Sequence, residues 1–539
     1  MAVLTTSKIA LQSCSPLKIA LGEITMKLGN LFLLPLAALT LLLPLASARA
    51  NDAEVKHVAF NSEAVGSHVM VEFDLRWENS WRNDLAGPGY AAPFNYDAAW
   101  VFVKFSTDGG ANWQHATLSA VGADHSVLID NGVAATIKAV PDGKGAFIFR
   151  AANGAGTNNW DDVQLRWNYS ADGVASITTS TIVNVLAVEM VFISAGNFFA
   201  GDQSPDPIEG QFEDGTSGNP LAISSEAALT LGGGSAGSLG NNNAEGMSHA
   251  DDFNDGASQT LPAAFPKGFA AFYVMKYEIS QSQYADFLNL LTAAQAAKRN
   301  ITGEANYTQF RGTVAGNYPL FSAAAADRAC NFLSWMDGAA YADWAGLRPI
   351  TELEYEKAGR GNQAVVSSEY VWGNTFVSRQ TGHSGVDGNG AETATPAGAN
   401  ANFLAGISGP VRAGIYSAAS FGSRADAGAS FYGVMELSGN LWERTVAVGK
   451  ASGRDFTGTH GDGMVTTAAG FEGNATNTDW PGINAVIARG VTDGLGAGFR
   501  GGGWTDQAKR LQLAIRVCAP SPENGRTNQY GFRCVRTAP

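Results

Sequence analysis

The stretch from residue 432 to residue 536 constrains the fold most, because glycine turns alternate there with aromatic and charged residues at fixed offsets. Three phrases mark it: Tyr432-Gly433-Val434-Met435-Glu436-Leu437-Ser438-Gly439-Asn440-Leu441-Trp442-Glu443, then Arg500-Gly501-Gly502-Gly503-Trp504, and finally Tyr530-Gly531-Phe532-Arg533-Cys534. This spacing leaves little room for long helices or strands. We therefore predict a loop-rich module with tryptophan and phenylalanine anchors in its core.

Composition places this module in a larger folded chain. A length of 539 residues exceeds one ordinary core, and 45% hydrophobic with 16% charged residues is typical of a globular protein. The net charge of −14 argues against nucleic acid as a partner. The same acidity also fits a protein that only has to stay soluble after export.

The first 50 residues have the features of an export signal. Lys27 precedes an apolar run from Leu31 to Leu45, and Ala48-Arg49-Ala50 provides the small residues of a signal-peptidase site. The run is short for a membrane span, and two prolines interrupt it. We expect cleavage after Ala50 and a secreted or periplasmic mature chain without a transmembrane span.

Three cysteines remain after such cleavage, namely Cys330, Cys518 and Cys534. In an oxidising compartment we expect one disulfide and one thiol left over, and the sequence does not say which two residues pair. The cysteines and histidines show no spacing typical of a metal site.

Two regions come after the leader. Residues 51–186 contain short apolar runs separated by turns, which predicts an all-β, sandwich-like domain without a catalytic constellation. Residues 187–537 form a second domain, in which 202–262 is a Gly/Ser/Asn-rich insertion that is either mobile or folded over the surface.

Three helices are expected in the second domain. Apolar residues between Tyr284 and Leu291 recur at helical spacing, and a second helix runs from about Asp337 to Gly346. A third begins at Thr351, where a capping box with Glu354 satisfies free backbone amides at the helix start.

Several phrases together resemble the formylglycine-generating enzyme, or sulfatase-modifying factor, domain family. The resemblance covers about 187–537. It rests on Met190-Val191-Phe192-Ile193-Ser194-Ala195-Gly196, Lys276-Tyr277-Glu278-Ile279-Ser280, Leu333 to Glu354, Trp372-Gly373-Asn374 and the three C-terminal phrases. It implies an α+β, C-type-lectin-like fold with little regular secondary structure.

The resemblance also bears on catalysis. The family's formylglycine generators oxidise a protein cysteine with copper held by two thiolates, the ligands that Cu(I) prefers. Those two positions correspond here to Asp506 and about Leu511, neither of which carries a thiol. Copper is therefore not expected. An iron-dependent branch of the family takes its histidines from a helical domain, and residues 51–186 offer no such helix.

Calcium is the metal that the resemblance implies. Carried over residue by residue, its ligands are the side chains of Glu436 and Glu443 and the carbonyls of Gly439 and Leu441. Mixed oxygen ligands of this kind suit Ca²⁺. Asn402 and Phe403 resemble part of a second site. The alternative is that the residues of this loop hold it together by hydrogen bonds alone and bind no calcium.

The segment between Trp504 and Tyr530 is the expected ligand surface. A rigid frame that displays an irregular loop suits binding, and the layout resembles the variable segment of retroelement-diversified lectin-fold proteins. The candidate ligand-binding residues are Trp442, Trp504, Asp506, Gln507, Lys509, Arg510 and Asn528. For Arg516, Arg526 and Arg533 the alternative is a structural role under the loops, which we favour for Arg533.

Two functions are compatible with these features. The first is an exported, non-catalytic binding or structural protein with a protein or glycan ligand on its C-terminal loops. The second is an oxidoreductase of the formylglycine-generating type acting on protein cysteine, or another metal-dependent oxidoreductase of the family. The absence of a thiol pair at Asp506 and Leu511 favours the first.

Overall fold

A computed structural model describes residues 49–50, 53–61, 64–84, 95–204, 210–242, 247–253, 258–417 and 423–539. The predicted leader lies outside these residues apart from Arg49 and Ala50. The described residues form one compact unit. Among the described residues, no helix is both long and apolar enough to cross a bilayer.

An antiparallel sheet of 13 strands organises this unit, with a central path β1-β2-β3-β4-β10-β17-β26-β20. Five more strands, β5 to β9, pair beside this path. The strands are β1 (Arg49–Ala50), β2 (Ala53–Phe60), β3 (Val69–Asn83), β4 (Asn95–Ser106), β5 (Gln114–His115), β6 (Ser126–Ile129), β7 (Ala135–Ala139), β8 (Ala146–Arg150), β9 (Gly154–Trp167), β10 (Ile182–Ile193), β17 (Phe272–Met275), β20 (Arg348–Pro349) and β26 (Cys534–Thr537).

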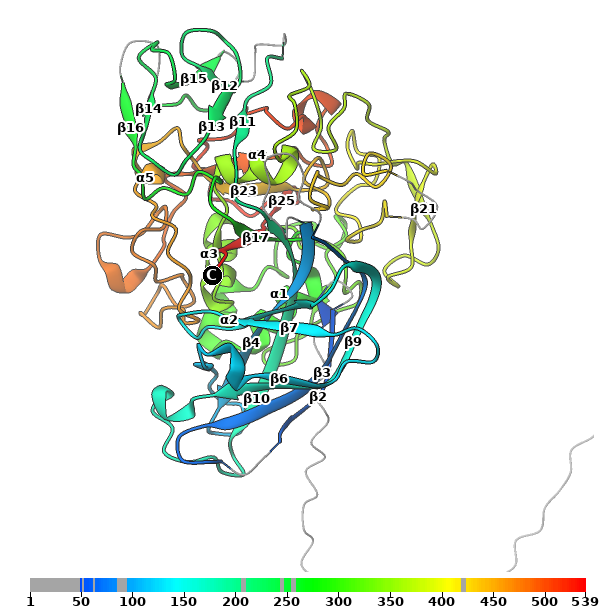
Figure 1. Ribbon diagram of the computed structural model, residues 1–539, viewed down its shortest axis with the longest axis vertical. Helices are drawn as coiled ribbons and strands as arrows, with labels where there is room; N and C mark the ends of the chain where they lie inside the picture. The colour runs from blue at the N-terminus through cyan, green and yellow to red at the C-terminus, as the bar shows by residue number, and fades with distance from the viewer. Residues whose placement is uncertain are drawn as a thin grey trace, which may run out of the picture. The chain divides into compact units, whose positions relative to one another are not determined.

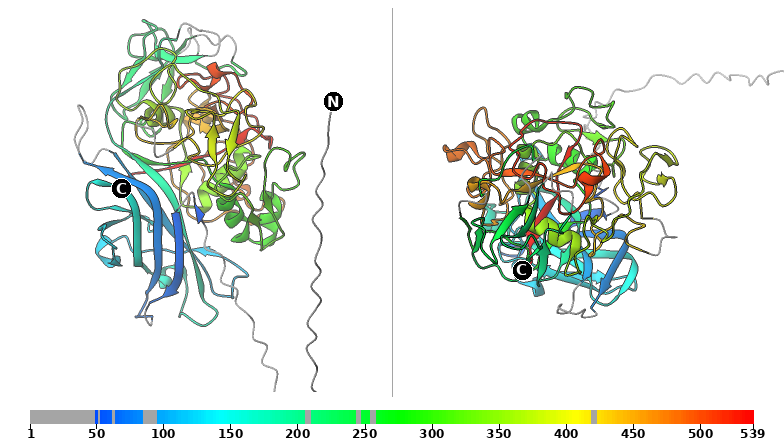
Figure 2. Two further views of the ribbon diagram at one scale, coloured as in Figure 1. Left: turned by 90° about the vertical axis from the view of Figure 1, so that its right-hand side faces the viewer. Right: turned by 90° about the horizontal axis from the view of Figure 1, so that it is seen from above.

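Strand β10 corrects the predicted domain boundary. It pairs with β4 along Ile182–Val191 and with β17 along Met190–Ile193, so it joins the N-terminal strands to the C-terminal part. A boundary at residue 187 would cut through this strand. The described part of residues 51–186 consists of strands, loops and two single-turn 3-10 helices, and its strands share one continuous sheet with strands of the C-terminal part. Figure 2 shows these N-terminal strands, blue to cyan, on one side of the loop-rich part.

Burial on both faces of β4 explains why the two regions do not separate. Ala99, Val101, Val103 and Phe105 point into a core between the N-terminal strands. The alternate residues, such as Trp100, point into the core of the C-terminal part. Because successive side chains of a strand face opposite sides, one strand supplies both cores.

Helices are short, and the three predicted ones are present together with two further α-helices, α2 and the four-residue α5. Helix α4 begins after Thr351, whose capping box with Glu354 is present as predicted. Helix α3 begins two residues earlier than expected, because Ser334 caps it through Asp337. The α-helices are α1 (Gln281–Asn289), α2 (Ala293–Arg299), which the sequence analysis missed, α3 (Trp335–Trp344), α4 (Glu352–Arg360) and α5 (Ala451–Arg454).

Short sheets and single-turn helices complete the loop-rich part. The insertion 202–262 is folded over the surface where it is described, because Asp251 forms a buried ion pair with Arg516. Its strands are drawn at the upper left of Figure 1. The remaining strands are β11 (Phe198–Ala200), β12 (Gln211–Asp214), β13 (Leu221–Ile223), β14 (Leu229–Leu231), β15 (Leu239–Asn242), β16 (Gln259–Leu261), β18 (Val314–Ala315), β19 (Ser322–Ala323), β21 (Gly382–Ser384), β22 (Thr393–Thr395), β23 (Trp442–Val446), β24 (Ala497–Arg500) and β25 (Tyr530–Gly531). The 3-10 helices are Gly122–Asp124, Tyr169–Asp172, Ile487–Arg489 and Ala508–Leu511.

Candidate functional site

A polar hollow lies directly after Trp504, with a volume of about 400 Å³. It is lined by Thr505, Asp506, Gln507, Lys509 and Arg510. A 3-10 turn over Ala508–Leu511 presents the two basic residues. Four of the seven predicted ligand-binding residues thus meet at one place on the surface.

The two predicted tryptophans do not contribute to this surface. Trp442 and Trp504 keep only 6% and 4% of their surface exposed. Trp442 packs with Phe499, and the indole N–H of Trp504 donates to the backbone carbonyl of Asn528. Trp442 and Trp504, predicted as ligand-binding residues, instead anchor the loops, and Asn528 is half-buried beside them.

Asp506 is built into the wall of the hollow. Its Oδ2 accepts from the Gly503 N–H at 2.9 Å, and its Oδ1 accepts from the Arg510 guanidinium at 3.0 Å. The lack of a side chain at Gly503 permits this, because a Cβ there would lie 2.9 Å from the Trp442 ring and 3.4 Å from Asp506 Oδ2. Asp506 therefore has a structural role in shaping the hollow.

Leu511, the second position of the family's thiolate pair, is fully buried. It packs in a core cluster with Tyr355 and Leu437. The two positions therefore carry a hydrogen-bonded carboxylate and a buried aliphatic side chain. Neither of these is a soft ligand of the kind that copper prefers.

The expected disulfide is absent. Cys330, Cys518 and Cys534 are all described, and none is in a disulfide bond. Cys330 and Cys534 are buried in the main core, whereas Cys518 packs against a separate cluster beside Trp442. Burial raises the pKa of the Cys330 and Cys534 thiols well above the ordinary value, so both are held as neutral thiols.

The predicted calcium ligand Glu443 is engaged by an arginine. Arg533 donates to both carboxylate oxygens, with its Nε at 2.8 and 3.0 Å and Nη2 at 2.6 Å, and both side chains are fully buried. The same guanidinium donates to the carbonyls of Met275 and Met435. The structural role favoured for Arg533 is confirmed.

Glu436 lies close to this pair and is less well satisfied. Its Oε1 accepts from the Gly414 N–H at 2.9 Å, whereas its buried Oε2 has no hydrogen-bond partner among the described residues. Burial raises the pKa of Glu436 to about 7, against the opposing effect of Arg533. Its backbone φ of 56° is in the left-handed region that the turn requires.

Glu278 is a third buried carboxylate here, and the sequence analysis gave it no role. It accepts from the Asn440 side chain at 2.7 Å and from the Leu441 N–H at 3.2 Å. Glu278 belongs to the Lys276–Ser280 phrase that the sequence analysis singled out, but nothing in the local sequence shows that this segment meets the turn at residues 440–441. We call Glu278, Glu436, Glu443 and Arg533 the loop cluster.

At the second predicted metal position, Asn402 and Phe403 hold a loop together by hydrogen bonds. The Asn402 side chain donates to the carbonyls of Ile407 and Gly409 and accepts from the Ile407 N–H. Phe403 is buried next to it and its carbonyl accepts from Gly406. Within the described residues, no three His, Cys, Asp or Glu side chains form a group that could hold a metal ion.

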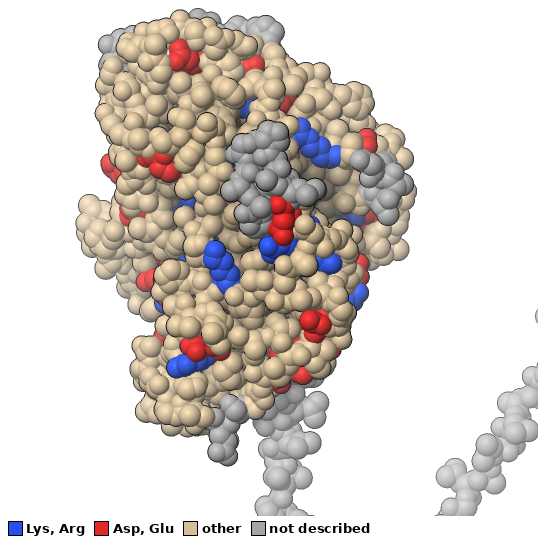
Figure 3. Space-filling view, in the orientation of Figure 1, with Lys and Arg blue, Asp and Glu red and all other residues tan. Residues whose placement is uncertain are grey.

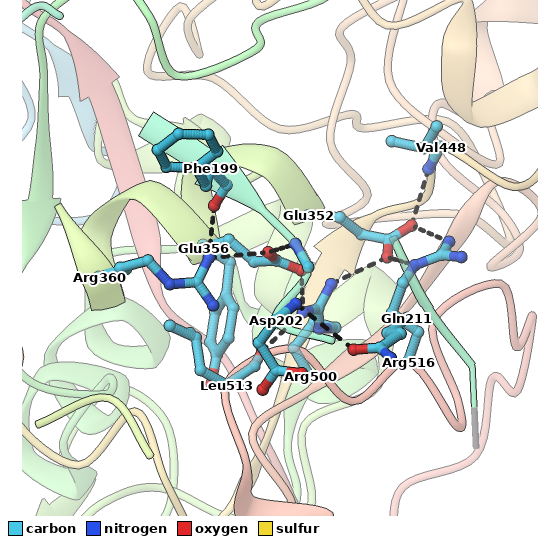
Figure 4. Close-up of polar contacts among 12 residues, drawn as sticks. Phe199, Asp202, Gln211, Glu352, Glu356, Arg360, Val448, Arg500, Leu513 and Arg516 are labelled. Atoms are coloured by element: carbon cyan, nitrogen blue, oxygen red, sulfur yellow. Dashed lines mark hydrogen bonds and ion pairs between the residues drawn. The ribbon is translucent and has the colours of Figure 1, made fainter. Parts of the chain in front are cut away.

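A second buried ionic network lies around helix α4 (Figure 4). Arg500 donates to Glu352 at 3.1 Å and to Glu356 at 2.7 Å, and Arg516 donates to Glu352 at 2.8 Å. Arg516 also binds Asp251 of the insertion at 2.6 Å. We call this set the α4 network. The network fixes both ends of the segment that carries the hollow. Arg516 therefore has a structural role under the loops, which was the alternative to ligand binding.

Arg526 also has a structural role, since it donates to both carboxylate oxygens of Asp337 at 2.7 and 2.8 Å.

On the face shown in Figure 3, basic side chains are scattered among acidic ones rather than gathered into a stripe. A continuous basic stripe is the footprint of nucleic-acid binding, and this face does not present one.

Fold and site together define a loop-rich α+β domain that is organised by glycine turns and buried arginine–carboxylate pairs. Residues 183–538 match the family model described as sulfatase-modifying factor enzyme 1-like domain. The chain belongs to this family.

Two curated relatives share part of this domain. Inactive Cα-formylglycine-generating enzyme 2 of Bos taurus is 33% identical over 139 residues, which are 26% of this chain and 39% of the relative. The protein of the same name from Mus musculus is 32% identical over 139 residues, 26% of this chain and 38% of the relative. The chain thus matches about two fifths of the length of each.

Two solved structures are similar to this chain over most of their own length. PvdO from Pseudomonas aeruginosa is 15% identical, with 65% of this chain and 95% of that chain covered at a TM-score of 0.27. Treponema denticola variable protein 1 is 14% identical, with 66% and 96% covered at a TM-score of 0.29.

Proposed function

We propose that this chain is an exported, non-catalytic binding or structural protein whose ligand surface is the hollow after Trp504. The proposal rests on Asp506 and Leu511, which occupy the two positions where the family's oxidases have copper-binding thiolates. Asp506 is hydrogen-bonded into its own loop, and Leu511 is buried in the core. Neither side chain can hold Cu(I) as a thiolate does.

The names of the curated relatives support the same conclusion. Both are called inactive, and the similarity to them covers 139 residues of this chain.

An oxidation assay tests the absence of catalysis. We expect the purified chain, supplied with Cu(I), oxygen and a cysteine-containing peptide, to form no aldehyde detectable by mass spectrometry. A Cys518→Ser variant is the control for adventitious thiol chemistry, because Cys518 is the most exposed of the three cysteines. Aldehyde formed equally by both proteins would overturn the proposal.

Export rests on the features of residues 1–50. When the chain is expressed with its own N-terminus in a bacterial host, we expect it outside the cytoplasm with Asn51 as its first residue. N-terminal sequencing measures this directly. A cytoplasmic protein with the leader intact would contradict export and leave the binding proposal untouched.

We also propose calcium as a structural ion near Glu436. The support is the buried Glu436 Oε2 atom, which lacks a partner among the described residues, with the Gly439 and Leu441 carbonyls as the remaining expected ligands. Glu443 and Asn402 do not fit, because Arg533 and the Ile407 N–H already engage their side-chain oxygens. If bound, the ion would neutralise excess negative charge.

A further inference from the structure

Four asparagines of the sequence are followed two positions later by serine or threonine, with a residue other than proline between. They are Asn168, Asn300, Asn306 and Asn474, and the structure describes all four. In a secreted protein this spacing marks an acceptor for an N-linked glycan, so the export proposed above is the premise here. Because the pattern is short and arises easily by chance, the surroundings of each asparagine must decide among them.

Three of the four side chains are held by the protein. Asn474 is buried, and its Nδ2 donates to the carbonyl of Arg489 at 3.0 Å. Asn168 and Asn300 are half-buried, and the Oδ1 atom of each accepts a hydrogen bond from a residue two positions away. A glycan is bulky and polar, so it needs solvent around the amide that carries it. Asn474 in particular has no room for one in the folded chain.

Asn306 has the opposite surroundings. Its side chain is exposed and forms no hydrogen bond with the described part of the protein, and the same is true of Thr308, the residue that completes the pattern. Their neighbours Ala305 and Gln309 are also exposed. A Cβ at Gly303 would have no heavy atom within 4 Å apart from its chain neighbours. The turn after helix α2 thus offers both polar groups of the pattern to solvent, with open space beside them.

Tyr307 fastens this turn to the core. Only 3% of its surface is exposed, its hydroxyl accepts from the Val314 N–H at 3.1 Å, and its ring centroid lies 5.5 Å from that of Phe332. One buried ring between two exposed polar residues holds the turn in place while the Asn306 amide and the Thr308 hydroxyl stay outside. A glycan on Asn306 would therefore have a fixed place on the surface.

The backbone of the turn accounts for only part of the pattern. Asn306 has a φ of 62°, a left-handed conformation that asparagine adopts more readily than most residues. The turn alone can therefore explain an asparagine at this position. It does not explain Thr308, whose hydroxyl forms no hydrogen bond with the described residues. An N-glycosylation acceptor does explain it, because the pattern requires a serine or threonine there.

We propose that Asn306 carries an N-linked glycan in the exported protein. The co-reactant is an oligosaccharide linked to a polyprenyl diphosphate. A bond forms between Asn306 Nδ2 and C1 of the first sugar, and the bond from C1 to the diphosphate oxygen breaks. The diphosphate leaves with that electron pair, and Nδ2 loses a proton. Because Tyr307 lies inside the acceptor pattern and is buried after folding, the transfer takes place before this turn folds. A glycan on Asn474 at that stage would prevent folding, because that side chain belongs inside the protein.

The test expresses the full chain with its own leader in a bacterial host that supplies an N-glycosylation transferase and its lipid-linked donor. We expect the folded protein outside the cytoplasm to carry one glycan, found by mass spectrometry on the peptide that contains Asn306. Thr308→Ala should lose that mass, because it removes the hydroxyl and keeps the asparagine. Thr302→Ala is the matched control, because it destroys the pattern at Asn300 and should leave the mass unchanged. Neither hydroxyl forms a hydrogen bond among the described residues, so both variants should melt like the wild type.

The outcomes separate the glycan from the export on which it depends. A chain found outside the cytoplasm, with Asn51 as its first residue and no glycan on Asn306, overturns the glycan and leaves export standing. A glycan that persists in Thr308→Ala, or one on Asn474 of the folded protein instead, also overturns it. A chain that stays in the cytoplasm contradicts export by residues 1–50, and the same host is then used with a known secretion leader in their place. The presence or absence of a glycan on Asn306 of that protein decides the proposal.

Discussion

The loop cluster and the α4 network are built from the same residue types and differ in charge balance. In the α4 network each carboxylate that faces the core has a guanidinium partner: Glu352 has Arg500 and Arg516, and Glu356 has Arg500. In the loop cluster three buried carboxylates share the guanidinium of Arg533.

The pKa values of the buried carboxylates in the two clusters differ as this charge balance predicts. Although burial opposes ionisation, the Arg516 guanidinium holds the pKa of Glu352 below its usual range. In the loop cluster, burial raises the pKa of Glu278 well above its usual range, and the Glu443 charge adds to the effect. Burial alone therefore does not decide the state of a carboxylate, because the number of cations within reach also counts.

The largest expected effect is that of Arg533→Met. It removes the cation that three buried carboxylates share, and removing one partner of a buried ion pair costs about 3–5 kcal/mol. Chemical denaturation measures the loss. The double variant Arg533→Met/Glu443→Leu should recover part of it, since an apolar pair of similar volume replaces the ions. A double variant as unstable as the single one would show that this pair is not the cause.

Arg516→Met is expected to cost less, about 3 kcal/mol. Glu352 keeps Arg500 as a partner, and only Asp251 loses its cation. Because Asp251 belongs to the insertion, limited proteolysis should cut within 202–262 sooner than in the wild type. Arg516→Lys, which keeps a charge, is the matched control. Insertion cleavage at the wild-type rate would contradict the docking role.

Asp202 is a further buried carboxylate, close to Glu356 of the α4 network (Figure 4), and gives a pH test. Burial raises its pKa to about 6, against the opposing charge of Arg360. Between about pH 4 and pH 6 the unfolded chain has lost this proton and the folded chain holds it, so this group makes stability fall as pH rises.

The expected fall is at most about 3 kcal/mol, at about 1.4 kcal/mol per unit of pKa shift. Asp202→Asn removes the titrating group, so the stability difference between wild type and variant should change with pH only over this window. Denaturation at pH 4, 5, 6 and 7 measures it. A difference that is constant across the series would contradict the raised pKa.

Calcium removal gives the smallest expected effect and tests the charge excess of the loop cluster directly. If an ion offsets this excess, EGTA should lower stability by about 1.4 kcal/mol when calcium had been tenfold above its Kd. Elemental analysis should find calcium and no copper. The Glu436→Gln variant should melt identically with and without EGTA. Identical melting of the wild type in both conditions would remove calcium from the proposal.

Local chemistry made much of the fold predictable. The Thr351–Glu354 capping box and the apolar spacing from Tyr284 placed two helices correctly, because both act within one or two turns of chain. The polar residues after Trp504 were predicted as a surface and meet at one hollow. The same reasoning failed for Trp442 and Trp504, because a tryptophan in a polar loop looks alike in sequence whether it anchors the loop or faces solvent.

Residue identity and short spacing were enough to establish the family frame, the capped start of α4 and the missing thiol pair at Asp506 and Leu511. Tertiary contacts were needed to show that Arg533 engages Glu443 across 90 residues and that β10 joins two regions into one sheet. They also showed that Asn474 is buried, whereas Asn306 is exposed. The physical reason is that these contacts join distant segments, and the free energy of burying a charge or an apolar face depends on what the rest of the chain brings to it.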